Sequence, residues 1–182
     1  MIFLVPYAYD RMPDGKPRKG VALKRLGSRA RIDALLVSLI KIFKVGEMRT
    51  YWFVLTAGYS KESVNSPTSK VHRSIAEEMG MYIISQNGDG LAIIPNELAW
   101  GTYQETARAI STIRTKALVG NHVFVSTNLG HMPRVWLCWL FLKPSSWEVH
   151  FVLADHSFTK KEWLQETVKF FIYLYRFLFR KW

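Results

Sequence analysis

The segment from residue 126 to 134, STNLGHMPR, contains the side chains best suited to binding an anion. Thr127 and Asn128 end a predicted strand, and His131 and Arg134 follow at the start of a predicted helix. The free backbone N–H groups of a helix start also favour negative charge. The segment therefore predicts an anion-binding site. The alternative is that Thr127 and Asn128 are capping residues and that His131 and Arg134 make structural contacts.

Two carboxylates precede this segment. Glu105 comes one turn after Thr102, which places both side chains on one face of a predicted helix, and Glu97 precedes them in a predicted loop. Together with His131, these glutamates would supply general acid and base groups or would hold ribose hydroxyls. The alternative is a helix cap with a surface glutamate. Catalytic candidates are thus His131, Glu105 and Glu97.

Several familiar signatures are absent from the sequence. It holds neither GxxxxGK[ST] nor GxGxxG after the first predicted strand, and no HExxH. The five histidines have no ligand-type spacing, so we predict no metal site. The single cysteine, Cys138, excludes an intramolecular disulfide framework. Gly58 and Ser60 follow a predicted strand directly and are ligand-binding candidates, although serines in such loops are mostly turn residues.

The formal charge of +11 is concentrated at the front of the chain, where residues 1–50 hold eleven Lys and Arg and four Asp and Glu. Such a surplus suits phosphate-bearing partners or reflects a solvated basic face. No aromatic residue is interleaved with the basic residues between Asp10 and Ile42, which disfavours nucleic-acid binding.

With 182 residues, 49% of them hydrophobic, the chain is expected to form a single domain. Short apolar strands alternate with amphipathic helices, which predicts an α/β fold with a mainly parallel sheet, a Rossmann-like three-layer sandwich. Ligands of such sheets bind beyond the carboxyl ends of the strands. The predicted strands are 2–5, 50–56, 81–85, 122–127 and 147–154, and the predicted helices are 30–43, 70–78, 102–118, 133–142 and 163 onward, with 88–100 a loop.

The C-terminal segment, residues 160–182, is predicted to form an aromatic helix. On a helix, Lys169, Tyr173, Arg176 and Arg180 form one stripe, with aromatic residues around the remainder. This pattern favours a helix packed on the sheet with the stripe exposed. An interfacial membrane anchor and a dimer contact are the alternatives. No stretch is long and apolar enough to span a bilayer, and the first residues do not read as an export signal.

The HMPR element after a strand ending in threonine, the TxxE segment from Thr102 and the strand end at residues 56–58 resemble the YdcF/SanA/ElyC-like bacterial family. The resemblance implies a Rossmann-like fold. It also implies binding of S-adenosylmethionine, as in the YdcF branch, and a link to the cell envelope, as in the others. By position it extends to Arg31 and Glu97, while Pro6–Ala8 replaces the glycine-rich turn of the family.

The sequence thus predicts a cytoplasmic protein, with peripheral contact at the inner membrane face as an option, that binds a nucleotide-type or phosphorylated small molecule. The alternative is a phosphoester or pyrophosphate hydrolase or transferase that uses a Glu/His pair. Whether the protein is an enzyme and its oligomeric state stay open. The predicted ligand-binding residues are Arg31, Gly58, Ser60, Thr102, Thr127, Asn128, His131 and Arg134.

Overall fold

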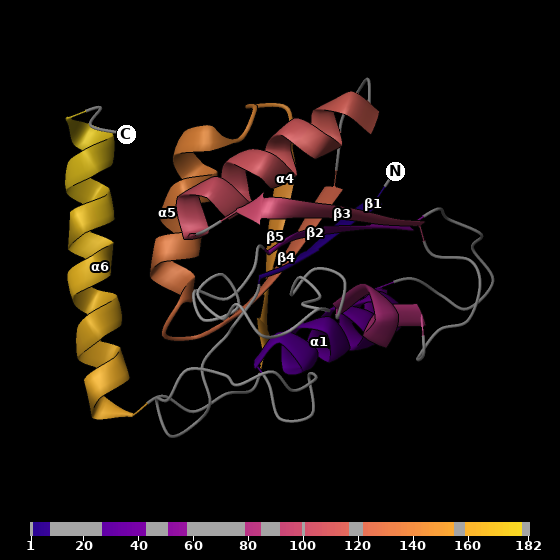
Figure 1. Cartoon of the computed structure of the whole chain (residues 1–182), viewed down its shortest axis with the longest axis horizontal. Helices are drawn as coiled ribbons and strands as arrows, with labels where there is room; N and C mark the ends of the chain where they lie inside the picture. Colours follow the sequence, from indigo (N-terminus) through magenta and orange to yellow (C-terminus); the bar gives the residue numbers. More distant parts are fainter. Residues whose placement is uncertain are drawn as a thin grey trace, which may run out of the picture.

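A computed structural model of the chain describes residues 2–7, 27–42, 51–57, 79–84, 92–99, 101–116, 122–154 and 159–179. These ranges contain five strands and five principal helices or helical segments arranged in layers (Figure 1). The strands are β1 (Ile2–Pro6), β2 (Tyr51–Ala57), β3 (Ala92–Ala99), β4 (His122–Asn128) and β5 (Glu148–Ala154). The labelled helices are α1 (Gly27–Ile42), α4 (Thr102–Lys116), α5 (Met132–Leu142) and α6 (Lys160–Leu178).

The five strands form one sheet in the order β3-β2-β1-β4-β5, and all neighbouring pairs are parallel. The chain moves outward in one direction from β1 to β3 and then returns to the other side of β1 with β4. The direction of winding therefore changes between β1 and β4. In doubly wound sheets, ligands bind at such a switch point, outside the carboxyl ends of the strands. The predicted α/β fold with a parallel sheet is confirmed.

Helices cover both faces of the sheet, because its strands carry apolar side chains on both sides. On one face, Ile32 and Leu35 of α1 pack against Ile2 and Leu4 of β1. On the other face, residues of α4 and α5 pack against alternate residues of the same strands, among them Phe3, Val5, Val123 and Val125, with Ala109, Ile110, Ile113, Val135 and Trp139 supplied by the helices. The site residues project from the ends of these packed elements.

Most predicted elements are present with ends shifted by a few residues, and two predictions are wrong. Residues 79–84 are helical, whereas residues 81–85 were predicted to be a strand. Met79 and Ile83 are both buried, and their spacing of four is the helical period, which a short apolar run does not reveal. The predicted helix 70–78 lies outside the described residues.

The second wrong prediction is the loop 88–100, because this segment contains β3. Its sequence, AIIPNELA, holds a proline and two polar residues, which hide the strand pattern. β3 is an edge strand, where a proline is tolerated because one side of the strand needs no ladder hydrogen bonds. Its pairing with β2 also shifts register between Leu55 and Ala57. Glu97 therefore belongs to a strand rather than to a loop.

α6 lies beside α5 at the edge of the molecule and contacts α5 rather than the sheet (Figure 1). A capping box starts the helix: Thr159 Oγ1 accepts from the Glu162 backbone N–H, and the Glu162 carboxylate accepts from the Thr159 N–H. The predicted aromatic helix is present, but it does not pack on the sheet as expected. None of the helices in the described part of the chain is long and apolar enough to cross a bilayer.

Candidate functional site

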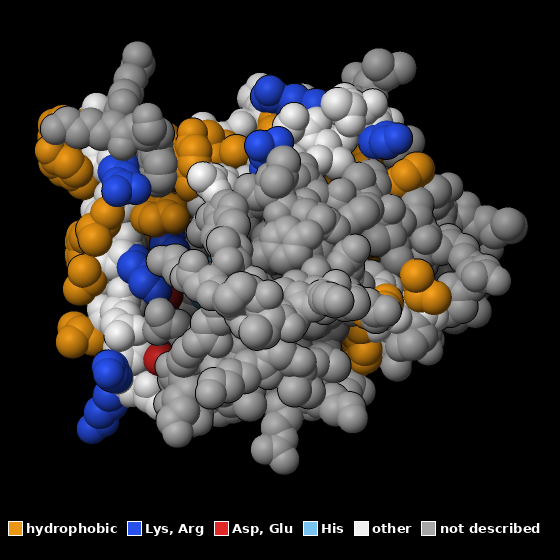
Figure 2. Space-filling view, viewed as in Figure 1, with side chains coloured by type: hydrophobic (Ala, Val, Ile, Leu, Met, Phe, Trp, Pro, Cys, Tyr) orange, Lys and Arg blue, Asp and Glu red, His pale blue; other side chains and the backbone are white. Residues whose placement is uncertain are grey.

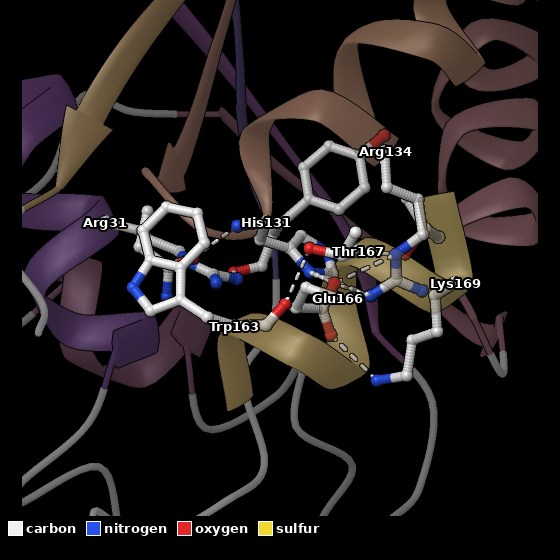
Figure 3. A network of polar contacts seen from close by, with 10 residues as sticks. Arg31, His131, Arg134, Trp163, Glu166, Thr167 and Lys169 are labelled. Atoms are coloured by element: carbon white, nitrogen blue, oxygen red, sulfur yellow. Dashed lines mark hydrogen bonds and ion pairs between the residues drawn. The ribbon is translucent and has the colours of Figure 1, made fainter. Parts of the chain in front are cut away.

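The predicted site residues meet at the carboxyl end of the sheet, next to the switch point between β1 and β4. Figure 3 shows Arg31 from α1, His131 and Arg134 from the start of α5, and Glu166 from α6 directed toward one another. Thr102 joins them from the first residue of α4, and Thr127 and Asn128 end β4. The structure therefore brings together six of the eight predicted ligand-binding residues. Gly58 and Ser60 lie outside the described residues.

Contacts with α4 and α5 hold His131 in one orientation. Its backbone N–H donates to the carbonyl and to the side-chain oxygen of Asn128, at 3.1 and 3.2 Å. Its ring Nε2 lies 3.3 Å from Thr102 Oγ1, and its Nδ1 lies 2.8 Å from Arg134 Nη2. Nδ1 also lies 3.2 Å from Glu166 Oε2, so it faces both a guanidinium, which can only donate, and a carboxylate, which can only accept.

Electrostatics favour the neutral form of the His131 ring. Burial, together with the positive charge of Arg134, lowers the pKa of His131 to about 3. The nearby Glu166 carboxylate acts in the opposite direction but does not offset burial. At neutral pH, His131 is therefore an uncharged donor and acceptor, and the positive charge of the site comes from arginine and lysine side chains.

Glu166 connects α6 to this site. Its Oε2 accepts from Arg134 Nε at 3.2 Å and from Arg134 Nη2 at 2.9 Å, and its Oε1 accepts from Lys169 Nζ at 2.8 Å. Burial acts to raise the pKa of Glu166, but the contact with His131 and the charge of Arg134 prevail and hold it well below its ordinary value. The carboxylate is therefore ionised and fully bonded at neutral pH.

The orientation of α6 corrects the prediction that its basic stripe is exposed. Lys169 bonds to Glu166, and Tyr173 lies beneath the Arg134 guanidinium, 5.3 Å from the ring centroid. Both residues belong to the predicted stripe, yet they face the site, while Arg176 is exposed. The buried ion pair between Glu166 and Arg134 requires that the side of α6 that carries Glu166 faces the interior.

A buried chain of hydrogen bonds supports the site from the opposite side. Trp139 Nε1 donates to the Tyr7 hydroxyl at 3.0 Å, and the Tyr7 hydroxyl contacts Thr106 Oγ1. Thr106 donates in turn to the Thr102 carbonyl at 2.7 Å, so the Tyr7 hydroxyl is the donor toward Thr106. This chain fixes the start of α4 against β1. Burial raises the pKa of Tyr7 well above its ordinary value, and Tyr7 stays protonated.

Arg31 approaches the same point from the other face of the sheet. It is completely buried, and its Nη1 donates to the Tyr7 carbonyl at 2.7 Å. Glu105 is also buried, which excludes the alternative that it is a surface glutamate. Glu97 lies in β3, whose side chains are outside the described residues.

Sequence reasoning missed Tyr7 and Glu166 as site residues. Tyr7 stands in the predicted loop after β1, and only its position at the end of the first strand hinted at the site. Glu166 is the single acidic residue in the mainly apolar and basic stretch 163–182. An isolated carboxylate in such a helix must either face solvent or pair with a buried cation. This requirement was the sequence signal that could have identified Glu166 as a site residue.

Ser126, Thr127 and Asn128 end β4 with side-chain atoms that lack hydrogen-bond partners. All three are completely buried, yet Ser126 Oγ, Thr127 Oγ1 and Asn128 Nδ2 have no hydrogen-bond partner within the described part of the chain. Leaving a buried polar group unsatisfied costs about 1–3 kcal/mol. Because side chains alternate along a strand, Ser126 and Asn128 face the α1 side of the sheet and Thr127 faces the α4 and α5 side, so these atoms lie on both sides of the end of β4.

Comparison of this chain with protein-family models, with curated proteins and with solved structures finds no significant match.

Proposed function

We propose that this protein binds a small molecule of nucleotide type, or a phosphorylated small molecule, at the carboxyl edge of the sheet between β1 and β4. The observation that carries the proposal is the set of unpartnered polar atoms on Ser126, Thr127 and Asn128. Buried polar groups in folded proteins are nearly always bonded to protein or water. A ligand with hydroxyl, carboxylate or phosphate oxygens would satisfy these donors.

The charges around these atoms favour an anionic group on the ligand. Arg31 and Arg134 are both buried, and Lys169 lies one turn from Glu166. The N-terminal end of α5 adds the partial positive charge of a helix start. Two guanidinium groups in a site of low dielectric constant attract phosphate or carboxylate more strongly than they would in water.

S-adenosylmethionine is the candidate that the family resemblance names, and its chemistry is compatible with the site. Its carboxylate would pair with a guanidinium, and its ribose hydroxyls would bond to the ends of β4. Glu105, buried on the first turn of α4, supplies a negative side chain of the kind that holds ribose in dinucleotide-binding folds. ATP shares the ribose and replaces the carboxylate by phosphates.

Thr127 offers the sharpest test, because Thr127→Val keeps its shape and removes one unpartnered hydroxyl. We expect this variant to raise the free energy of unfolding of the ligand-free protein by about 1 kcal/mol. Calorimetry of the wild type with S-adenosylmethionine, ATP and inorganic pyrophosphate identifies the probe that binds. Thr127→Val should bind that probe at least tenfold more weakly than the wild type does. Thr115→Val, which removes an exposed hydroxyl on α4, is the matched control and should leave binding unchanged.

Binding of no probe to the wild type, or equal binding to wild type and Thr127→Val, would overturn this proposal. His131→Ala is a second variant that should lose binding, because His131 connects Thr102 to Arg134.

The alternative function, hydrolysis or transfer at a phosphoester or pyrophosphate, has less support. It uses His131 as the acid, whereas the buried ring is neutral at physiological pH. A neutral imidazole is a weak proton donor. Turnover of pyrophosphate-linked substrates that is lost in a His131→Ala/Glu105→Gln double variant would favour catalysis over binding alone.

We further propose that α6 attaches the protein peripherally to an anionic membrane surface, at its cytoplasmic face. The outer side of α6 exposes large apolar residues at helical spacing, and Figure 2 shows hydrophobic and basic side chains together along this edge of the molecule. Val168, Phe171, Ile172, Tyr175 and Arg176 line a groove there. The exposed apolar residues of α6 are Trp163, Leu164, Val168, Phe171, Ile172, Tyr175 and Leu178.

Charge identifies the partner of this apolar face. Lys160 and Lys161 are exposed at the start of α6, and the sequence continues with Arg180 and Lys181 after its end. Both acidic residues of the helix are used elsewhere: Glu162 caps the helix, and Glu166 bonds to Arg134. An apolar face with exposed Lys160 and Lys161 at its start and exposed Arg176 in its last turn matches the boundary of an anionic bilayer.

Vesicle co-sedimentation tests this attachment. Wild-type protein should pellet with vesicles in which roughly a fifth to a third of the lipid is anionic, because such a surface attracts basic residues. Phe171→Glu should reduce the fraction of protein bound to these vesicles at least fivefold. Ser111→Glu makes the same charge change on an exposed position of α4 and should bind like wild type. The proposal would be contradicted if Phe171→Glu pelleted with vesicles as well as wild type does. It would also be contradicted if the wild type did not bind vesicles but formed a dimer that Phe171→Glu dissociates.

A further inference from the structure

A second cluster of histidine and glutamate lies at the opposite edge of the sheet, away from the candidate ligand site. His122 begins β4 and Glu148 begins β5, and the two are register partners. His150 follows two residues later on β5. Because side chains alternate along a strand, Glu148 and His150 project from one face of the sheet. Parallel pairing places His122 and Phe124 on that same face.

The three side chains converge on one point. His122 Nδ1 lies 3.1 Å from Glu148 Oε2, and His150 Nε2 lies 3.8 Å from the same oxygen. One ligand atom from each residue lies within 4.8 Å of the others. In a tetrahedral zinc site, with bonds of about 2.0–2.2 Å, neighbouring ligand atoms are roughly 3.3–3.6 Å apart. Small side-chain rotations would therefore place all three on one ion.

Neighbouring rings orient the two imidazoles. The His150 ring stacks on Phe124 with a centroid distance of 4.8 Å, and the His122 and His150 rings stack at 6.0 Å with an angle of 18° between their planes. Phe124 itself is buried in the core beneath α1. The ring of His150 is thus supported by a fixed neighbour, while all three residues remain open to solvent.

We propose that His122, Glu148 and His150 bind a divalent transition-metal ion at the amino edge of β4 and β5. Two imidazoles and one carboxylate favour Zn²⁺, Co²⁺, Ni²⁺ or Cu²⁺ over Mg²⁺ and Ca²⁺, which prefer sites made of oxygen atoms alone. Exposure leaves one or more coordination positions for water. The ion would also link the edge strand β5 to β4, so that metal binding stabilises the fold.

The histidine spacing in the sequence gives no sign of this site, because His150 comes 28 positions after His122. Only the pairing of β4 with β5 brings the ligands together. Among the described residues, these three are the group of His, Cys, Asp and Glu whose ligand atoms lie close enough to share an ion.

The untagged full chain, freed of metal with a chelator, allows a direct test. Zn²⁺ at micromolar concentration should bind with one ion per chain in calorimetry and should raise the thermal midpoint, while Mg²⁺ should do neither. Co²⁺ should give visible absorption bands of a low-coordinate site. His150→Ala should weaken Zn²⁺ binding at least tenfold, and Glu148→Gln should weaken it less but measurably.

His72→Ala is the matched control, because it removes one histidine and leaves all three proposed ligands in place. It should bind Zn²⁺ like wild type. Absence of Zn²⁺ binding to the wild type would overturn the proposal, as would equal binding by wild type and a His122→Ala/His150→Ala double variant. Both substitutions are at exposed positions, so the variants should remain folded, and circular dichroism checks this.

Discussion

A histidine–glutamate pair lies at each end of β4, and the two pairs have nearly the same N···O distance. His122 Nδ1 lies 3.1 Å from Glu148 at the start of the strand, and His131 Nδ1 lies 3.2 Å from Glu166 just beyond its end. Their surroundings differ. The side chains of the first pair are 51% and 68% exposed, while those of the second are 11% and 10% exposed.

This difference shows that distance alone does not define what a pair can do. The exposed pair is solvated, contributes about 0–1 kcal/mol, and is free to exchange its partners for a metal ion. The buried pair shares its carboxylate with Arg134 and is enclosed by α4, α5 and α6, so each of its members depends on the others. The first arrangement suits reversible coordination, and the second provides a fixed, charged wall for a ligand site.

Glu166→Gln should produce the largest effect of the variants considered. It removes the negative charge that offsets Arg134 and Lys169, and breaking a buried ion pair costs about 3–5 kcal/mol. We expect the free energy of unfolding to fall by about 3 kcal/mol, measured by urea denaturation. A loss below about 1 kcal/mol would show that the buried pair behaves like an exposed one.

The pH dependence of stability should reveal His131 next. The folded ring has a pKa of about 3, whereas an unfolded histidine has one of about 6.5, so the unfolded chain binds more protons between these values. The contribution of His131 to the free energy of unfolding is therefore complete above pH 6.5 and is lost as the pH falls toward 3. At pH 5 the slope due to this residue is about 1.4 kcal/mol per pH unit.

His131→Gln should remove that slope, while His122→Gln should keep it. Urea denaturation between pH 7 and pH 5 separates this effect from that of Glu166. The low pKa of Glu166 means that its stabilisation is lost only as pH falls below the ordinary carboxyl range. An unchanged slope in His131→Gln would contradict the neutral, buried state of the ring.

Tyr7→Phe should have an intermediate effect. It leaves the Trp139 N–H without its acceptor and the Thr106 hydroxyl without its donor, both in the buried interior. We expect the free energy of unfolding to fall by about 2 kcal/mol. Tyr175→Phe, on the exposed side of α6, serves as the control and should change it by less than about 0.5 kcal/mol. Equal effects of the two substitutions would argue against the buried hydrogen-bond chain.

Glu148→Gln should have the smallest effect on the metal-free protein. The partners of Glu148 are exposed, so we expect a change of at most about 0.5 kcal/mol in the free energy of unfolding. Zn²⁺ should widen the difference between this variant and wild type. A large loss of stability without metal would show that the exposed pair is already structural and would remove the contrast between the two ends of β4.

The sequence by itself determined the α/β class, the parallel sheet and the convergence of Thr127, Asn128, His131 and Arg134. These features are local: apolar runs define the strands, and residues a few positions apart share one strand end and one helix start. Residues 79–84 and β3 were not predictable in this way. The six described helical residues at 79–84 and an edge strand interrupted by Pro95 carry too few periodic positions to identify them.

Only the tertiary structure decided which residues from distant segments complete the two ends of β4. Glu166 is 35 residues from His131, and its side of α6 turns inward because Arg134 needs a carboxylate in the interior. Likewise, Glu148 and His150 reach His122 through strand pairing alone. Helical periodicity shows which residues share a face of a helix. The partner of that face is determined by packing and by the pairing of buried charges, and neither can be predicted from local sequence.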